Sequence, residues 1–431
     1  MQEPVNPEII DKGVPTAGLI AHTMVAHFVD HLPYYRLEAI NARSGVHTPR
    51  STLASWSGAG GASLAPLYEA HRAFVLGAKV LHADETPVRM LTPAPGAGKT
   101  AKAYVWAYAR GEHDTTAGVV YDFCTGRGSK YPAKFLTGWT GTLSCDDYGG
   151  YDVLFKRQGC IEAGCLAHAR RKFDELARAN ASPIAEQAIA RIARIYRVEA
   201  QAREMTTQAR LAHRIQHTQG LWDELHAWMR LERMRVADGG GIAAALDYSL
   251  KRWVALGRFL TDGAVSVDNN HIENQMRPWA MGRKAWLFAG SESAGKRAAM
   301  VMSLIQSAKL QGHDPWQYLK DVLERRDATR RCVRPGSVCR PSGVQPTCGG
   351  ALRCRRAPAA GAAVPVHHPT RTGQRTGTDQ RRRAGGAQTQ DALARRQHAH
   401  RDEPAGVHAA PGGTGERRAP FMRPCRGPGC I

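Results

Sequence analysis

Apolar residues recur at helical spacing through residues 17–76, which predicts that this part of the chain is helical. From about residue 78 the spacing changes to the alternation that is typical of β-strands. Four β-type runs cover residues 79–84, 103–108, 117–122 and 141–146. Residues 165–168 predict a further strand that leads into a helix. Together these runs predict a mixed α/β sheet that follows a small helical region.

Helical spacing returns in two further parts of the chain. Residues 176–260 carry three apolar stripes and predict a helical insertion between sheet elements. Residues 268–326 predict a capped helix, then a buried helix and a last helix. The residues expected to begin, interrupt or end these helices are Asp268 or Asn269, Pro278, Gly312 and Asp314.

The first helical region has the outline of a helix-turn-helix. A short helix over residues 35–40 is followed by a break at Gly45 and by a second helix. Such a motif would present Arg50, Ser51 and Thr52 to a DNA groove. An ordinary helical hairpin, whose second helix only packs, would have the same outline.

Charge is distributed unevenly along the 431 residues, whose net charge is +21. Residues 331–431 hold 18 Arg and no Lys against three Asp and two Glu, a net charge of +13. With so few large apolar residues this segment cannot offset its ordering entropy, so we expect a disordered tail. We therefore divide the chain into five parts. Residues 1–76 are a helical region, residues 77–175 the first part of the core, and residues 176–260 a helical insertion. Residues 261–330 are the last part of the core, and residues 331–431 are the tail.

Several classes of protein are excluded by the sequence. The first residues lack the basic and apolar segments of a signal peptide, and no apolar run reaches the ~20 residues of a membrane helix. The four cysteines before the tail have the character of thiols in a reducing compartment. We expect a soluble, intracellular protein with no membrane partner. Cys160, Cys165 and His168 suggest zinc, but a fourth ligand is missing.

Three acidic residues stand out by their position. Asp84 and Asp146 each end a predicted strand, and Glu273 lies near the start of a predicted helix. Carboxylates that converge from such positions can hold two Mg²⁺ ions and assist an in-line phosphoryl displacement. The alternatives are structural, with Asp84 as a strand-end cap and Glu273 as an i,i+4 partner of Arg277.

Basic residues near these acids favour a partner that carries phosphates. They are Arg170, Arg171 and Lys172 at a predicted helix start, and Arg277, Arg283 and Lys284 after the third acid. Trp279 and Trp286 lie among the second group, and such interleaving suits a nucleic-acid backbone with an unstacked base. The alternative is a solvated basic face over a buried tryptophan pair.

Two stretches look like phosphate-binding loops. Residues 93–100 have the Gly-Lys-Thr of a Walker A motif, but Pro stands at its first Gly and a β-type run follows. Residues 290–297 precede a helix but lack the final Ser or Thr that would hold Mg²⁺. The second stretch motivates a P-loop ATPase as a further hypothesis.

Five strings occur in one order along the chain. They are LHADETPV at 81–88, DDYGGY at 146–151, CLAHARRKF at 165–173, DNNHIENQMRP at 268–278 and GRKAWLFAGS at 282–291. Together they closely resemble the DDE transposases of insertion-sequence family 66. The resemblance runs from about Gly18 to Arg325.

This resemblance implies an RNase H-like fold that is interrupted by a helical insertion before the last acid. It implies that Asp84, Asp146 and Glu273 are the catalytic and metal-binding triad, for two Mg²⁺ ions or for Mn²⁺. The implied reaction is hydrolysis at the element's ends, followed by attack of the freed 3′-OH on target DNA. The implied partners are both DNAs, further copies of the chain on DNA and accessory proteins of the element, in the bacterial cytoplasm at the nucleoid.

The chain also departs from that family. Members usually begin with a coiled coil and a cysteine-rich zinc-binding region, and they usually have Trp where Leu166 stands. After about Arg325 the resemblance ends, and the tail resembles GC-rich DNA read in a shifted frame. We therefore expect an N-terminally truncated copy with a frameshifted C-terminus. An inactive DNA-binding remnant is the alternative function.

Overall fold

The computed structural model of the protein describes residues 9–10, 15–92, 99–180 and 182–333. It contains a five-stranded mixed sheet among helices, so the predicted α/β class is confirmed, and the arrangement is consistent with an RNase H-like fold. From residue 334 onward, the expected tail lies outside the described residues. Within the described part of the chain, no helix is both long and apolar enough to cross a membrane.

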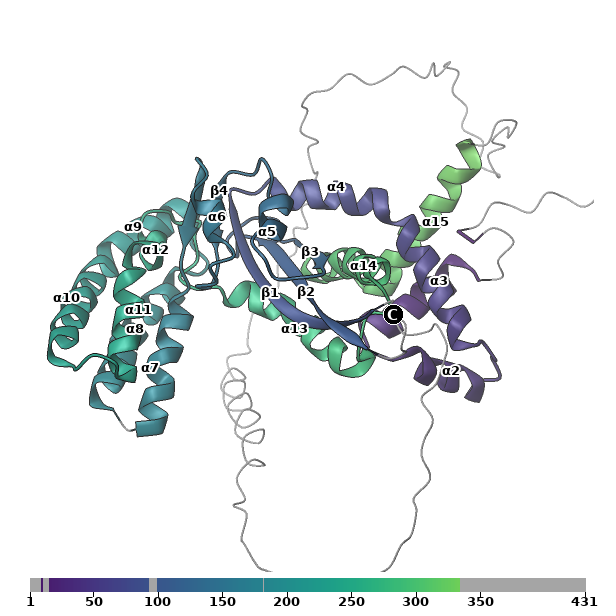
Figure 1. Cartoon of the computed structure of the whole chain (residues 1–431). Helices are drawn as coiled ribbons and strands as arrows, with labels where there is room; N and C mark the ends of the chain where they lie inside the picture. Colours follow the sequence, from purple (N-terminus) through teal and green to yellow (C-terminus); the bar gives the residue numbers. More distant parts are fainter. Residues whose placement is uncertain (1–8, 11–14, 93–98, 181, 334–431) are drawn as a thin grey trace, which may run out of the picture. The chain divides into compact units, whose positions relative to one another are not determined.

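The helices form three groups along the chain (Figure 1). Those before the sheet are α1 (Ala17–Phe28), α2 (Tyr34–Arg43), α3 (Arg50–Ser63) and α4 (Ala65–Leu76). Two short helices lie between strands, α5 (Lys130–Phe135) and α6 (Asp152–Phe155). The third group is α7 (Leu166–Asn180), α8 (Pro183–Ala202), α9 (Thr207–His217), α10 (Gln219–Arg235), α11 (Gly241–Lys251), α12 (Trp253–Leu256), the 3₁₀ turn Arg258–Leu260, α13 (Asn270–Trp286), α14 (Glu292–Leu310) and α15 (Pro315–Val333).

The sheet has the strand order β3-β2-β1-β4-β5. Its strands are β1 (Val80–Leu91), β2 (Thr100–Arg110), β3 (Val119–Cys124), β4 (Gly141–Ser144) and β5 (Cys160–Ala163). The first three are antiparallel, whereas β4 runs parallel to both β1 and β5. Because β4 pairs only with residues 80–82 of β1, the rest of β1 has no neighbouring strand on that side, and only its end is bridged, by Ala289.

Two local predictions are wrong, and one of the two outcomes expected at Pro278, an end or an interruption of the helix, is excluded. Asp84 does not end a strand, because β1 continues to Leu91 as one arm of a long hairpin with β2. Residues 165–168 are not a strand, since β5 ends at Ala163 and α7 begins at Leu166. Pro278 does not end its helix, because α13 continues to Trp286 with buried residues on both sides of the proline.

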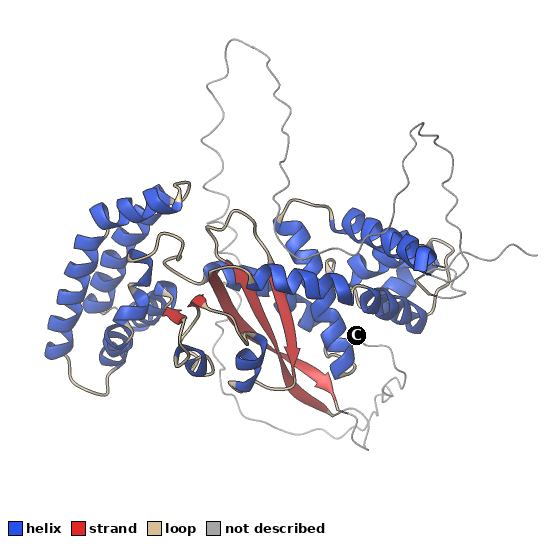
Figure 2. Ribbon diagram, turned by 90° about the horizontal axis from the view of Figure 1, so that it is seen from above, coloured by secondary structure: helices blue, strands red, loops and turns tan. Residues whose placement is uncertain are grey.

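Helices cover both faces of the sheet (Figure 2). On one face, α13 and α14 pack with α1 and α15 against apolar side chains such as Val88 and Val105. On the other face, α4, α5 and α6 cover Trp106 and Tyr108. Asp84 lies on β1, where Ala107 of β2 is its partner. The first acid therefore lies on the strand that is central in the sheet.

Side chains close the outer edge of β3. Ser303 and Ser307 of α14 accept hydrogen bonds from the backbone N–H groups of Tyr121 and Val119. The hydroxyl of Tyr68 on α4 donates to the carbonyl of Tyr121 at 2.9 Å. An edge strand with unpaired backbone groups would be a template for another chain. Here the same hydrogen bonds fix α4 and α14 to the sheet.

The helical insertion has its own apolar core, in which α7, α8, α10 and α11 pack side by side. Two arginines of α9, which belongs to the same insertion, are buried. Arg210 donates to backbone carbonyls that include that of Gly263 at 2.8 Å. Arg214 pairs with Glu199 at 2.7 Å and donates to the carbonyl of Val265 at 3.0 Å. The insertion is thus bonded to the segment that leads into α13.

We predict that Ser303→Ala destabilises the protein by about 1–3 kcal/mol, because the buried N–H of Tyr121 loses its acceptor. The measurement is urea-induced unfolding. Ser293→Ala, on an exposed turn of the same helix, is the matched control and should change stability by less than about 0.5 kcal/mol. Equal effects of the two substitutions would contradict the capping role of Ser303.

Candidate active site

The three acids come from three different elements. Asp84 lies within β1, Asp146 follows the neighbouring parallel strand β4, and Glu273 lies in the first turn of α13, which packs on β1. Burial raises the pKa of Asp84 to about 7, and the negative charges of Glu85, Asp146 and Glu273 add to this rise. The three acids are therefore electrostatic neighbours, although they are 62 and 127 residues apart in sequence.

The donor chemistry of this cluster fits a divalent cation. The Oε1 atom of Glu273 is buried without a hydrogen-bond partner, and Asp84 is held among like charges. Hard carboxylate oxygens without a hydrogen-bond donor suit Mg²⁺. The side chains do not converge on one point, however. Among the described residues, no three His, Cys, Asp or Glu side chains are arranged to hold a metal ion.

Glu273 faces α7 across the site. Its carboxylate lies 3.7 Å from Nε2 of His168 and 3.6 Å from the guanidinium of Arg171. Its ion-pair partner is therefore not Arg277, whose side chain is exposed, and the interpretation of Glu273 as an i,i+4 partner is wrong. A basic residue of α7 and the third acid share one side of the site.

The two neighbouring aspartates after β4 have different surroundings. Asp146 accepts a hydrogen bond from the backbone N–H of Tyr148 at 3.0 Å, which leaves its second oxygen available. Asp147 instead forms an ion pair with Arg252, which also binds Glu162 at 2.6 Å. The structure therefore favours Asp146 over Asp147 as the acid that could hold a cation.

A cavity of about 370 Å³ opens beside Asp146. His168, Arg171 and Lys172 line it, so two of the three predicted basic residues of α7 are brought to the acids. Lys172 also lies over the ring of Tyr248, with Nζ 4.3 Å from its centroid. Arg170 is exposed but does not line this cavity. The cavity therefore has Asp146 on one side and the positively charged side chains of α7 on the other.

The basic residues of α13 lie farther along β1. Arg283 donates to Oγ1 of Thr86 at 2.8 Å and to the carbonyl of Pro87 at 3.0 Å, whereas Lys284 is exposed. Trp279 and Trp286 are only 3% and 4% exposed and meet edge to face. The prediction that they stack on an unpaired base is wrong, and they form the buried tryptophan pair of the alternative.

The predicted helix-turn-helix residues lie at the start of α3. Arg50 and Ser51 are exposed, Thr52 is half-buried, and Leu53 anchors the helix in a small core with α1 and α2. The two helices and the turn between them have the predicted outline. A role of these three residues in DNA binding stays a prediction.

Asn269 connects the elements that carry the first and last acids. Its Nδ2 donates to the carbonyl of Ala83 at 2.9 Å, and its Oδ1 accepts from Nδ1 of His82 at 2.7 Å. Its backbone N–H donates to Sγ of Cys165 at 3.1 Å, at the start of α7. Burial lowers the pKa of His82 to about 3, so the ring is neutral. Because Oδ1 of Asn269 can only accept, Nδ1 of His82 carries the proton.

Sequence reasoning missed the role of Asn269 because it treated the residue as a helix cap. The structure shows no side-chain cap from Asn269, and the N–H of Asn270 is bonded to Asp268 instead. The adjacent asparagines of the DNN string are the signal that was available. The contact of Asn269 with His82, 187 residues earlier in the chain, could not be predicted from a local pattern.

Glu85 is a second residue that sequence reasoning missed. Its side chain is 1% exposed, and it binds Arg127 at 2.6 Å and the hydroxyl of Tyr151 at 2.8 Å. Arg127 also lies 3.7 Å over the ring of Tyr148. These contacts tie β1 to the segment after Asp146. The sequence offered one signal for Glu85, its position next to Asp84 in the string LHADETPV. It offered no signal for Arg127, which lies in a turn outside the five strings.

The cysteines of the suggested zinc site have other partners. Cys165 accepts from Asn269, and the thiol of Cys160 donates to the carbonyl of Trp139 at 3.4 Å. Burial raises the pKa of Cys165 to about 12, which disfavours the thiolate that zinc requires. The structure thus assigns these residues to packing and positioning.

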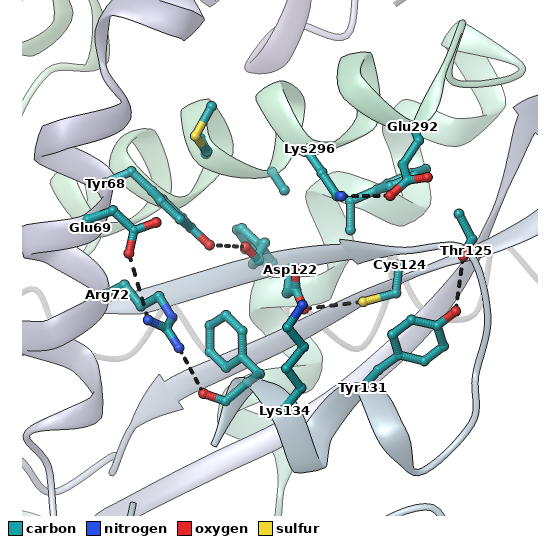
Figure 3. Close-up of a pocket in the computed structure, with 15 residues that line it drawn as sticks. Tyr68, Glu69, Arg72, Asp122, Cys124, Thr125, Tyr131, Lys134, Glu292 and Lys296 are labelled. Carbon is teal, nitrogen blue, oxygen red and sulfur yellow. Dashed lines mark hydrogen bonds and ion pairs between the residues drawn. The ribbon is translucent and has the colours of Figure 1, made fainter. Parts of the chain in front are cut away.

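The stretch that resembled a phosphate loop lines a different cavity, at the β3 edge (Figure 3). There Lys296 pairs with Glu292 at 2.6 Å, and Ser291 caps α14. A Cβ on Gly295 would lie 2.5 Å from the ring of Phe123, so glycine is needed for helix–strand packing. Of the first look-alike, residues 93–98 lie outside the described residues, and Thr100 begins β2.

Comparisons with known proteins identify the family. The family model "Transposase IS66 family" matches residues 12–297, and "IS66 C-terminal element" matches residues 303–331. The chain is 37% identical to the uncharacterized protein y4qI of Sinorhizobium fredii, over 74% of this chain and 60% of y4qI. It is 32% identical to y4jD of the same organism, over 75% of this chain and 65% of that protein. The chain therefore spans less than two thirds of the length of these relatives.

We predict that Asn269→Ala destabilises the protein by about 2–4 kcal/mol, because two buried groups, on His82 and Ala83, lose their partners. Urea-induced unfolding measures the change. Asn270→Ala is the matched control, since the neighbouring side chain is exposed and bonds only to Asp268. A loss as large for Asn270→Ala would contradict the connecting role of Asn269.

The raised pKa of Asp84 predicts how stability depends on pH. An acid whose folded pKa lies above its unfolded value of 3.8 stabilises the protein at low pH, and this contribution is lost as pH rises toward 7. In the absence of metal, Asp84→Asn should therefore be more stable than the unsubstituted protein by about 1–4 kcal/mol at pH 8. The difference should vanish near pH 4.

Thermal unfolding with a chelator present measures this difference across the pH range. Asp152→Asn, at an exposed aspartate of α6, should show no such dependence on pH. A gain in stability for Asp84→Asn that is equal at all pH values would contradict the electrostatic origin.

Proposed function

The chain belongs to the IS66 family of transposases, and from this membership we propose that it is a DDE-type transposase. The proposed reaction is Mg²⁺-dependent hydrolysis at insertion-sequence ends, followed by strand transfer into target DNA. The observation that carries the proposal is that the three acids come from elements that pack together, since β4 is the parallel neighbour of β1 and α13 packs on β1, and the charges of Asp146 and Glu273 add to the rise that burial causes in the pKa of Asp84.

We propose that the three acids are the metal ligands. Asp84, Asp146 and Glu273 would hold two Mg²⁺ ions, with Mn²⁺ as a substitute. When bound, such a pair activates the attacking oxygen and stabilises the leaving oxygen of a phosphoryl displacement. In the hydrolytic step, a water oxygen bonds to phosphorus as the bond to the 3′-oxygen breaks. In the transfer step, that 3′-OH displaces a 3′-oxygen of the target strand.

The residues around the acids would bind and orient the DNA. Arg171 and Lys172, which line the cavity beside Asp146, are proposed to contact phosphates near the reacting bond. Arg170, Arg277 and Lys284 are exposed and are proposed to contact more distant phosphates. Asn269 touches no reacting atom, and it acts by holding Glu273 and Asp84 in register.

Partners and location follow from the same proposal. The DNA substrates are the element's ends and the target, and the protein would act as an oligomer on DNA in the cytoplasm, at the nucleoid. Arg50, Ser51 and Thr52 at the start of α3 are proposed to contact DNA in a groove. Accessory proteins of the same element are further proposed partners.

A second candidate function is an inactive DNA-binding remnant. It is favoured by the observation that, among the described residues, no three His, Cys, Asp or Glu side chains are arranged to hold a metal ion. Both candidates predict DNA binding that weakens with salt, and only the first predicts cleavage. A P-loop ATPase is not proposed, because Gly295 and Lys296 pack and pair within the protein.

We expect the full chain to nick or join DNA that carries the element's ends when Mg²⁺ is present, and to do neither with a chelator. Asp84→Asn, Asp146→Asn and Glu273→Gln should each reduce the rate by at least about a thousandfold, because each removes a metal ligand. Gel electrophoresis of labelled DNA measures the products.

Asp147→Asn is the matched control, since this neighbouring acid is engaged by Arg252. It should retain most of the activity. Cleavage that persists in Asp84→Asn would overturn the catalytic assignment, and DNA binding without cleavage by the unsubstituted chain would favour the remnant.

A further inference from the structure

A second positively charged surface lies beyond the acids, at the far end of the β1–β2 hairpin. A groove of about 550 Å³ is lined by Arg89 of β1, Lys102 of β2 and Arg283 of α13, together with Leu287. The remaining lining residues are Pro87, Val88, Thr100 and Ala101, so no acidic side chain lines this groove. Arg89 and Lys102 are exposed.

The two cations on the hairpin face each other directly. Arg89 and Lys102 are partners in the antiparallel register of β1 and β2. Like charges in opposite positions on a strand pair destabilise the pair. Within the described ranges, neither residue forms an ion pair with an acid, and nor does Arg283. Residues 93–98, outside those ranges, contain only Pro, Ala and Gly. Among the described residues, therefore, no acid balances the charge of Arg89, Lys102 and Arg283.

Arg283 joins this groove to the acidic site. Its guanidinium donates to Oγ1 of Thr86 and to the carbonyl of Pro87, two and three residues after Asp84. Thr86 lies on the same face of β1 as Asp84, because side chains alternate along a strand. By the same alternation Arg89, with its partner Lys102, lies on the opposite face of the hairpin from Asp84, so a strand of DNA that leaves the acids would meet Arg283 first and would pass around the edge of β1 to reach Arg89 and Lys102.

Leu287 adds an apolar side chain to the wall of the groove. It is 63% exposed, and its backbone has φ of 70°, a left-handed value that is unfavourable for leucine. The conformation is held because Ala289, two residues later, pairs with Arg89 and Leu91 at the end of β1. An apolar residue that is both strained and exposed gains nothing from packing within the free protein.

We propose that this groove binds the DNA strand on one side of the cleaved phosphodiester, with phosphates on Arg89, Lys102 and Arg283 and a sugar or base against Leu287. This inference rests on the proposed function, and it adds Arg89, Lys102 and Leu287 to the DNA-binding residues. Phosphates would supply the negative charge that the groove lacks.

The first test measures the binding of a mixed-sequence DNA duplex to the full chain by fluorescence anisotropy over a range of salt concentrations. Asp84→Asn is present throughout so that the DNA stays intact. Each phosphate contact contributes about 0.9 to the slope of log K against log salt, so Arg89→Ala with Lys102→Ala should lower the slope by about 1.8. Between about 50 and 200 mM salt, the parent should then lose roughly twelvefold more affinity than the double variant.

The control removes the same charge elsewhere. Arg230→Ala with Arg235→Ala, on α10 of the helical insertion, should leave the slope unchanged. All variants carry the same Arg-rich residues 331–431, so any contribution of these residues cancels in the comparison. Equal slopes for the groove variant and the parent would overturn the proposal.

Lys102→Glu separates binding from stability. It places an acid opposite Arg89, so the melting temperature should stay equal or rise, whereas DNA affinity should fall. Leu287→Gly should likewise weaken binding without lowering the melting temperature, because glycine tolerates the backbone conformation. A fall of affinity that always accompanies a fall of melting temperature would show a structural role only, and would overturn the proposal.

The outcomes for this groove and for the proposed function are independent. If groove variants bind DNA as the parent does while Asp84→Asn abolishes cleavage, only the groove proposal fails. If the unsubstituted chain cleaves nothing and the groove variants still lose affinity, the groove stands and the catalytic proposal fails.

Discussion

The buried side chain of Asn269 is the contact on which the arrangement of the acids depends. One amide satisfies the carbonyl of Ala83 and the ring of His82, and the backbone of the same residue reaches Cys165. In the interior, a buried donor or acceptor without a partner costs far more than the net gain of a hydrogen bond. Strand β1, helix α7 and helix α13 are therefore held at one point, within four residues of Glu273.

The edges of the sheet follow the same physical rule. On the β3 side, two serines and a tyrosine satisfy the groups that a neighbouring strand would otherwise bind. On the β1 side, Pro87 has no N–H to leave unpaired, its carbonyl is bound by Arg283, and Ala289 pairs with the end of the strand. These contacts, at the β3 edge and along the part of β1 that β4 does not cover, fix α4, α13 and α14, so the helices that carry or support the acids are positioned by hydrogen bonds to the sheet backbone.

The sequence predicted much of this fold, because its strong signals are local. Helices over residues 17–76 and 176–260 and the first three strands were expected from periodicity, and the three acids were named from position and from motif. Local patterns did not predict the features that depend on contacts between residues far apart in the sequence. Pro278 reads as a helix end until the burial of Met276 and Trp279 on the sheet is known. The tryptophans read as a stacking surface until their burial is seen. The closeness of Glu273 to α7 depends on chain segments that lie on opposite sides of the insertion.

The buried arginines of α9 have a consequence for cooperativity. Arg210 and Arg214 bond to carbonyls between residues 259 and 265, a few residues before Asn269. If the insertion opened on its own, these cations would lose their partners and the segment leading into α13 would be released. The insertion and the α/β core should therefore open as one unit in hydrogen exchange, and the insertion is not a spacer that could be shortened freely. A change deep within it would reach the acids through the backbone, without any contact between the altered residue and the site.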